Sequence, residues 1–251
     1  MMRTGPWTEG PDGRPCLGSL GVLVDDMLGY AVVRARPEDH WPTSLEIHVE
    51  FSGHMPIDGS PIYAESRAID LSPSGGLAQG RLFDAAGRTI AIASQRLRYI
   101  PGTPSAVLSA ASTAEGTAGE PARDAAPATA ADFRPATTLE QLGGTLTRHD
   151  SGARLAIPVS PAVSNPNRTL HGGIMLCATE IAGHHAVQSA ERPLRTGAVH
   201  ISYLRPGPLE GEVVFEATTV HRGRSLAVAQ VVSRNGQGKV CTFATVTSHA
   251  P

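Results

Sequence analysis

The sequence lacks the features that mark several large classes of protein. It has no long basic run, and 21 Lys and Arg residues against 23 Asp and Glu residues leave a formal net charge of −2. This balance gives no electrostatic footprint for nucleic acid or for an anionic membrane surface. No apolar run approaches the roughly 18 residues of a membrane span, and the start of the chain contains no apolar signal-peptide core. We therefore expect a cytoplasmic protein that has neither nucleic acid nor a membrane as a partner.

Cysteine is also scarce. Cys16, Cys177 and Cys241 are odd in number and lie far apart, with no Cys-x-x-Cys pair. A disulfide framework needs paired cysteines, and a structural zinc site needs closely spaced ligands. The sequence therefore predicts reduced thiols, with neither a disulfide framework nor a zinc site.

The length and composition suffice for one large domain or two ordinary ones. The 251 residues are 41% hydrophobic and 18% charged, which is a normal globular balance. Between Gly102 and Pro135, Ala, Thr, Ser, Gly and Pro dominate and almost nothing is available to bury. This composition is typical of a flexible linker. We predict an N-terminal domain at residues 1–101, a linker at 102–135 and a C-terminal domain at 136–251.

The N-terminal part begins with an irregular arm, residues 1–15, which leads into an apolar segment of helical length at 16–33. Segments with alternating apolar and polar residues follow, separated by turn residues, and predict an antiparallel meander of strands. The strands are expected at 44–51, 61–71, 76–84 and 89–100. A fifth strand could come from the arm or from a flank of the helix.

The C-terminal part repeats this order. A short helix and a hairpin precede an apolar helix after His171, and four further strands follow. The short helix is expected at 138–144, the hairpin at 145–150 and 153–160, and the strands at 196–206, 212–223, 225–235 and 239–249.

The two parts also align with each other. Ser44–Phe51 aligns with Thr196–Tyr203, and Gly87–Gln95 aligns with Gly238–Val246 at nearly the same offset. Such an internal repeat of a helix plus a curved antiparallel sheet predicts two similar units that pair within one chain.

The stretch that carries chemistry is a His171-Gly172-Gly173 turn at the start of an apolar helix. Glycine lets the backbone approach a ligand, and the first N–H groups of a helix are unpaired and partly positive. A carbonyl oxygen that becomes an oxyanion would be stabilised there by about 3–4 kcal/mol per donor. Glu180, on the same helix among apolar residues, could then act as a general base. By itself, the turn fits an ordinary loop equally well, with Glu180 a solvated helix residue.

These patterns resemble the hotdog-fold acyl-CoA thioesterases, in which a curved antiparallel sheet wraps a long helix and two hotdogs form sites at their interface. The resemblance implies an α+β fold with two hotdog domains that form an intrachain pseudo-dimer. It also implies hydrolysis of an acyl-CoA substrate by carboxylate-activated water, with no cofactor and no metal. Because hotdog pairs commonly associate further, we expect a homo-oligomer of double-hotdog chains.

The C-terminal half resembles the PaaI-like acyl-CoA thioesterases over most of its length. Four elements match at fixed spacing, which is more specific than a His-Gly-Gly turn alone. The matching positions are Asn165, His171 with Gly172 and Gly173, Glu180 and Thr196. Glu180 departs from the commoner Asp of that family.

The N-terminal half resembles the catalytic half of the TesB-like thioesterases. There, an Asp on the helix, a Ser or Thr at the start of the first long strand and a Gln on the last strand hold a nucleophilic water. These roles fall on Asp25, Ser44 and Gln95, with Asp26 as an alternative to Asp25. This half has lost its own His-Gly-Gly turn, and Cys16–Gly18 stands in its place.

In hotdog pairs the turn comes from one hotdog and the carboxylate from its partner, so the resemblance implies one complete site. Its members would be Asn165, His171, Gly172, Asp25, Ser44 and Gln95. The Gly172 N–H would bind the thioester carbonyl, Asp25 would activate water or attack directly, and Asn165 would position the water or the thioester. Gly173 is expected to contact substrate.

A second site would combine Cys16–Gly18 with Glu180 and Thr196. It would lack the Asn, the His and the Gln, since Val246 stands where Gln95 does. We expect this second site to be weak or vestigial.

Other interpretations of these residues stay open. Arg222 and Arg224 are candidates to hold the phosphates of coenzyme A. Glu180 and His184 share a helix face, as metal ligands can, but no third ligand is in view, so no metal site is predicted. The segment before the His-Gly-Gly turn resembles in part the enoyl-CoA hydratase signature, with Val163 in place of its Asp. The alternative functions are therefore a hydratase or a non-catalytic acyl-CoA binding module.

Overall fold

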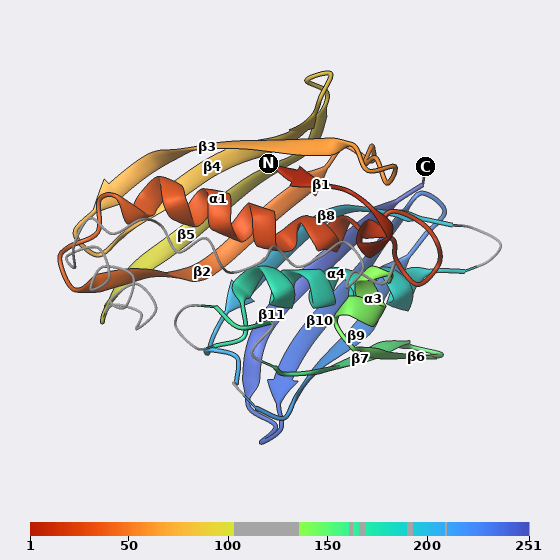
Figure 1. Cartoon of the computed structure of the whole chain (residues 1–251). Coiled ribbons are helices and arrows are strands. Elements are labelled where there is room, and N and C mark those ends of the chain that lie inside the picture. Colours follow the sequence, from red (N-terminus) through yellow and green to blue (C-terminus); the bar gives the residue numbers. More distant parts are fainter. Residues whose placement is uncertain (103–135, 161–162, 166–168, 190–192, 209, 251) are drawn as a thin grey trace, which may run out of the picture.

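Two helices that meet near their N-termini organise the structure, a computed structural model of the whole chain. The longest are α1 (Gly21–Val33) and α4 (Gly172–Val187), and both lie on the same side of one sheet (Figure 1). Shorter helices are η1 (Pro6–Thr8), η2 (Leu17–Leu20) and α3 (Thr138–Gln141). The structure describes residues 1–102, 136–160, 163–165, 169–189, 193–208 and 210–250.

A continuous antiparallel sheet runs through both halves of the chain, in the order β1-β3-β4-β5-β2-β8-β11-β10-β9-β7-β6. The N-terminal strands are β1 (Met2–Arg3), β2 (His40–Phe51), β3 (Pro61–Ser72), β4 (Gly75–Asp84) and β5 (Thr89–Pro101). The C-terminal strands are β6 (Thr145–His149), β7 (Gly152–Pro158), β8 (Arg195–Tyr203), β9 (Glu212–Arg222), β10 (Leu226–Asn235) and β11 (Val240–His249). The halves join where β2 pairs with β8, from Glu46 opposite Ser202 to Glu50 opposite Ala198.

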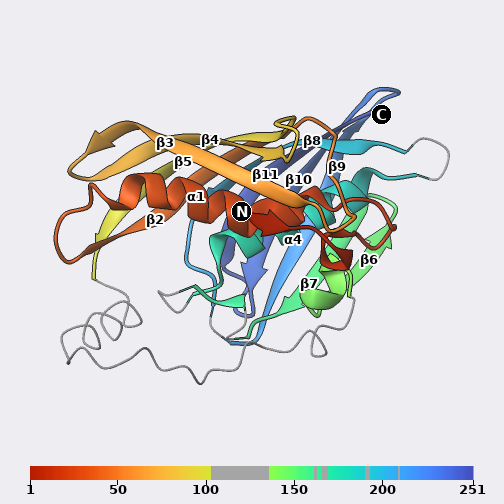
Figure 2. The same cartoon turned by 45° about the horizontal axis from the view of Figure 1, so that its top comes forward.

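Each helix packs on the strands of its own half. On α1 and the preceding turn, Leu20, Val24, Leu28 and Val32 recur every four residues and are almost fully buried, because this spacing places them on one helix face. Helix α4 contacts β7, β9 and β10 in the same way. Figure 2 shows each helix lying across its own set of strands, with the two helices side by side. The predicted fold of two hotdog units paired within the chain is confirmed.

The two helices approach each other closely at a pair of glycines. A Cβ on Gly21 would lie only 2.3 Å from the carbonyl oxygen of Gly173, and a Cβ on Gly173 would lie 2.5 Å from that of Gly21. No other residue fits at such a distance without moving a backbone. This contact brings the start of α4 beside the N-terminal part of α1, where Asp25 lies.

The structure corrects the predicted four-strand meander. Strands β3, β4 and β5 are consecutive neighbours, but β2 pairs with β5 rather than with β3. The connection between β2 and β3 covers residues 52–60, which is too long to force a tight hairpin. The extra strand of this half comes from the N-terminal arm, where β1 pairs with β3.

The predicted linker, apart from Gly102, lies outside the described residues. Among the residues that the structure does describe, no helix has the length and apolar character needed to cross a membrane.

Candidate active site

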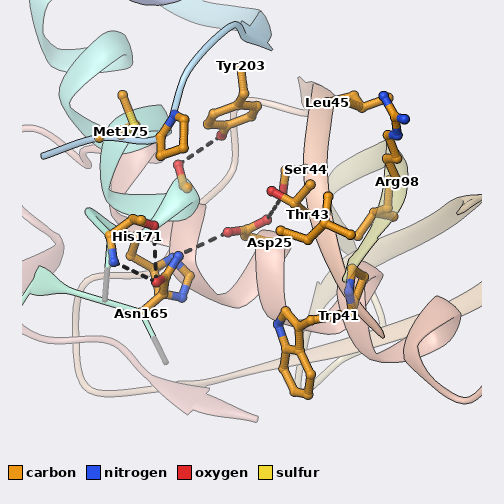
Figure 3. Close-up of a pocket in the computed structure, with 18 of the residues that line it drawn as sticks. Asp25, Trp41, Thr43, Ser44, Leu45, Arg98, Asn165, His171, Met175 and Tyr203 are labelled. Carbon is orange, nitrogen blue, oxygen red and sulfur yellow. Dashed lines mark hydrogen bonds and ion pairs between the residues drawn. The ribbon is translucent and has the colours of Figure 1, made fainter. Parts of the chain in front are cut away.

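Asp25 occupies the middle of the contact between the two halves (Figure 3). Its Oδ1 atom accepts hydrogen bonds from the Ser44 hydroxyl, at 2.9 Å, and from the Gln95 amide, at 2.6 Å. Gln95 also donates to the Ser44 oxygen at 2.7 Å. Because β2 pairs with β5, Ser44 and Gln95 lie on neighbouring strands, and both hold the same carboxylate oxygen.

The His171-Gly172-Gly173 turn faces the other carboxylate oxygen. The Gly173 N–H donates to Asp25 Oδ2 at 3.0 Å and also to Nδ1 of His171 at 3.0 Å. A Cβ on Gly172 would lie 2.7 Å from the same Oδ2 atom, so only glycine leaves this approach open. Within the described part of the chain, the N–H of Gly172 has no hydrogen-bond partner. A free donor at a helix N-terminus therefore lies next to a carboxylate oxygen.

Tyr203 fixes the orientation of this turn. Its hydroxyl donates to the carbonyl oxygen of Gly172 at 2.8 Å, and that carbonyl shares a peptide plane with the Gly173 N–H. The plane is thus held at one edge by Tyr203 and at the other by Asp25. Burial, together with the charge of Asp25, raises the pKa of Tyr203 well above its usual value, so the hydroxyl keeps its proton.

His171 lies between the two aspartates that follow each other on α1. Its Nδ1 atom is 3.3 Å from Asp25 Oδ2, and its Nε2 atom is 3.3 Å from Asp26 Oδ1. Since Nδ1 accepts the Gly173 N–H, we assign the ring proton to Nε2, where Asp26 accepts it. Burial lowers the pKa of His171, but the hydrogen bond with Asp26 and the charges of both aspartates outweigh this and raise it overall.

The environment also perturbs Asp25. Burial raises the pKa of Asp25 above its ordinary value, although the charge of His171 and the bonds from Ser44 and Gln95 oppose the shift. The Asp25 side chain is 12% exposed, whereas Asp26 is 51% exposed. A carboxylate with a raised pKa, beside an unpaired backbone donor, is suited to proton transfer.

Asn165 lies at the wall of the same site. Its side-chain oxygen accepts hydrogen bonds from the Thr169 N–H, at 3.0 Å, and from the Thr169 hydroxyl, at 3.1 Å. Asn165 lines the pocket, and its NH2 group has no partner among the residues that are described.

These groups open into a pocket of about 460 Å³, a size that holds a small organic ligand. It lies where β2 and β8 separate, because β2 pairs with β8 only from Glu46 onward and residues 41–45 have a free edge. Arg98 and Arg205 also line it. In the described structure the Arg98 guanidinium has no hydrogen bond or ion pair, and Figure 3 shows it beside Leu45, with Thr43 between it and Asp25.

Glu180 and Thr196 form a second cluster at the equivalent place in the other half. Thr196 donates to Glu180 Oε1, while the Gly18 N–H and the Cys16 thiol approach Oε2 at 3.4 and 3.5 Å. Glu180 is 4% exposed and Thr196 1% exposed. The cluster thus repeats the pattern of the first one in a closed form.

Two predicted residues lie away from the pocket. In the sheet, Arg222 pairs with Ala227, Ala227 with Ser248, and Ser248 with Thr196. Arg222 is therefore level with Thr196, about 23 Å along β8 from Tyr203 at roughly 3.3 Å per residue, and Arg224 follows it. Neither arginine lines the pocket.

The structure adds residues to the site that the sequence did not indicate. These are Tyr203, Arg98 and Arg205, whereas Asp26, the predicted alternative to Asp25, contacts His171. A Tyr at the end of a strand, or an Arg on or after a strand, carries no signal of its own. Across the described ranges, no three His, Cys, Asp or Glu side chains are placed to hold a metal ion.

Comparison with known proteins gives this geometry a context. Residues 160–249 match the family model of the acyl-CoA thioesterase N-terminal domain. No curated protein matches the chain. Among solved structures, the tesB protein of Mycobacterium avium subs paratuberculosis is 11% identical, with 100% of this chain and 95% of that one covered and a TM-score of 0.63.

Two further structures are similar. A protein assigned as an oleoyl thioesterase from Lactobacillus plantarum is 14% identical, with 99% of this chain and 94% of that one covered and a TM-score of 0.63. The PaaI protein of E. coli is 24% identical over 45% of this chain and 83% of its own, with a TM-score of 0.43. At such identities the two full-length likenesses establish the fold alone. Residues 160–249 are therefore similar to the acyl-CoA thioesterase domain family, within a chain whose fold is a double hotdog.

Proposed function

We propose that this protein hydrolyses acyl-CoA thioesters to a carboxylic acid and free coenzyme A. The observation that carries the proposal is the meeting of Asp25 from one half with the Gly172–Gly173 turn from the other. The carboxylate lies next to the turn, and Asp25 and Gly172 both line the pocket, which a thioester carbonyl can enter. The thioesterase family match of the half that supplies the turn supports the same chemistry.

The two oxygens of Asp25 have separate roles in this proposal. Ser44 and Gln95 hold Oδ1 and fix the rotation of the carboxylate, so Oδ2 faces the turn. The thioester oxygen accepts the Gly172 N–H, where the helix N-terminus stabilises its developing negative charge. Asp25 then takes a proton from water as the water oxygen bonds to the carbonyl carbon, or attacks that carbon itself.

The remaining step is release of the thiol. The carbon–sulfur bond breaks, the sulfur leaves as a thiolate, and the proton that Asp25 took from water returns to that sulfur. In the direct-attack variant, water afterwards hydrolyses the acyl-Asp25 anhydride and supplies the proton. Asn165, with its free NH2 group at the pocket wall, positions the thioester.

One site per chain is expected to work. The cluster of Glu180 and Thr196 is almost fully buried, so a substrate has no direct access to it. It also lacks a counterpart of Gln95, because Val246 packs at that place against α4, where a Cβ on Gly183 would lie 2.4 Å from it. These features support the view that the second cluster is structural.

The proposal extends to the wider organisation of the protein. We assign the two hotdogs to residues 1–101 and 136–251, with a linker at 102–135, and expect double-hotdog chains to associate in the cytoplasm. The three free, buried cysteines suit a reducing compartment.

The test of the function is a panel of acyl-CoAs assayed by thiol release. Hydrolysis of at least one of them with a stoichiometric thiol product is the expected result. Hydration of an enoyl-CoA without thiol release would indicate a hydratase, and tight binding without turnover would indicate a binding module. Either of these two results contradicts the proposal.

Arg98 and Arg205 are the cations that we assign to the phosphates of coenzyme A. Replacing Arg98 with Gln is expected to raise KM for an acyl-CoA roughly 10-fold with little change in kcat, because one charge-assisted hydrogen bond to phosphate is lost. The measurement is steady-state hydrolysis, repeated with an N-acetylcysteamine thioester that has no phosphate.

Two comparisons make the Arg98 result specific. Arg222→Gln, far along the sheet, should leave KM unchanged, and the phosphate-free thioester should be hydrolysed equally by Arg98→Gln and the parent. An equal rise in KM for the acyl-CoA and for the phosphate-free thioester would show that Arg98 does not bind the phosphates.

A further inference from the structure

One residue of α1 beside the proposed active site is unexplained by the fold. Asp25, Gly29 and Val33 recur every four residues, so they follow each other along one face of α1, and all three line the pocket. Gly29 lies inside the helix, where glycine is among the least favourable residues. A glycine one turn after the proposed base therefore needs a reason.

Close packing of α1 against α4 does not explain the glycine at position 29. A Cβ on Gly21 or Gly173 would collide with the other helix, but a Cβ on Gly29 would meet no atom within 4 Å among the described residues outside its own helical turn. The space in front of Gly29 belongs to the pocket. Any larger side chain at this position would project into that space, so the glycine keeps the surface of α1 open next to Asp25.

Apolar residues form part of the wall of this space. On β5, Leu97 is buried on the side facing α1 while Arg98 and Ile100 lie on the opposite face, as alternation along a strand requires. On β2, Pro42 precedes Ser44 by two residues and so shares the side that faces Asp25. Val33 closes the row on α1, about 12 Å from Asp25 at roughly 1.5 Å per helical residue.

Charge then sets the direction in which a substrate lies. Arg98 lies on the exposed face of β5, opposite to the face that packs on α1, whereas Asp25 and Asp26 are on α1 itself. An anionic coenzyme is attracted to the former and repelled by the latter. The groove beside Gly29 is left for the neutral, apolar end of the molecule.

We propose that Gly29 is the residue that determines acyl specificity: it opens a groove along α1 between Val33, Pro42 and Leu97 that takes a medium-length apolar acyl chain. This inference rests on the proposed hydrolysis of acyl-CoA. The distance from Asp25 to Val33 limits the length of the acyl chain. Because Gly29 has no side chain, the acyl chain can enter the groove.

The test compares the parent with Gly29→Ala and Gly29→Leu, using acetyl-CoA and octanoyl-CoA and measuring thiol release. Gly29→Leu is expected to lower kcat/KM for octanoyl-CoA about 100-fold, because several methylene contacts are lost, and to change that for acetyl-CoA less than about threefold. Gly29→Ala should have an intermediate effect on octanoyl-CoA.

Thermal unfolding separates this result from damage to the fold. Alanine favours the helix over glycine, so Gly29→Ala is expected to raise the melting temperature by about 2–4 °C while activity on octanoyl-CoA falls. If the ratio of kcat/KM for octanoyl-CoA to that for acetyl-CoA is unchanged in Gly29→Leu, the proposed acyl groove is wrong, while the proposed hydrolysis is unaffected. A parent protein that releases thiol from no acyl-CoA would instead overturn the proposed function.

Discussion

Replacing Asp25 with Asn is expected to lower kcat for acyl-CoA hydrolysis roughly 10²–10⁴-fold, the usual contribution of a general base. The amide has nearly the shape of the carboxylate and can still accept the bonds of Ser44 and Gln95 through its oxygen. It cannot take a proton from water or attack a carbonyl. The measurement is thiol release under saturating substrate, with KM expected to change little.

Glu180→Gln is the matched control, because Glu180 is the equivalent carboxylate of the closed cluster. Its activity is expected to stay within about twofold of the parent, since an interaction away from the reacting atoms does not affect the barrier. Comparable losses of activity in both variants would show that both clusters contribute to hydrolysis. A loss in Glu180→Gln alone would show that Glu180, and not Asp25, is the base.

The dependence of the hydrolysis rate on pH is expected to follow the ionisation of Asp25. Burial first of all raises its pKa, so hydrolysis is lost on acidification at a higher pH than an ordinary carboxyl, near 3.9, would give. Because the pKa of Asp25 is higher in the folded than in the unfolded state, the free energy of unfolding falls as the pH rises from the ordinary to the raised pKa, and it stays lower above the raised pKa. Asp25→Asn should therefore lose the acid limb of the profile and unfold at a denaturant concentration no lower than the parent.

Adding one methyl group at Gly172 is expected to have the second largest effect. The alanine Cβ would lie 2.7 Å from Asp25 Oδ2, closer than such atoms can approach, so the carboxylate must move away from the turn. A displacement of about 1 Å costs roughly 10²-fold in rate. The expected result for Gly172→Ala is thus a fall in kcat of that order at nearly constant KM.

A second glycine provides the comparison for Gly172→Ala. Gly236 lies in a surface turn, and a Cβ there would meet nothing within 4 Å in the described structure. Gly236→Ala should keep full activity. If Gly172→Ala matched it, Asp25 would not act through the space beside the turn.

The sequence predicted most of the fold and the centre of the site because both follow from spacing along the chain. The buried row of α1 and the turn before α4 are local patterns, and the internal repeat relates Asp25 to Glu180 and Ser44 to Thr196. The hydrogen bonds that Ser44 and Gln95 make with Asp25 place together three residues that were selected by pattern. Whether they catalyse hydrolysis stays a prediction.

The parts that the sequence did not indicate depend on how strands lie side by side. Arg222 and Arg224 are visible as a basic hairpin tip, yet the pairing of β9 with β10, and of β10 with β11, puts them at the far end of β8. Arg98 lines the pocket because β2 and β8 do not pair before Glu46. Register and strand separation arise from the packing of whole sheets, and no short stretch encodes them.

The pairing of β2 with β8 places both parts of the proposed active site in a single polypeptide. In an enzyme built from two separate subunits, a composite centre disappears when the subunits dissociate on dilution. Here the partner hotdog is covalently tethered, which keeps its effective concentration high whatever the amount of protein in solution. Specific activity should therefore stay constant down to the most dilute assay, and either hotdog can change its sequence without the same change being copied into the other.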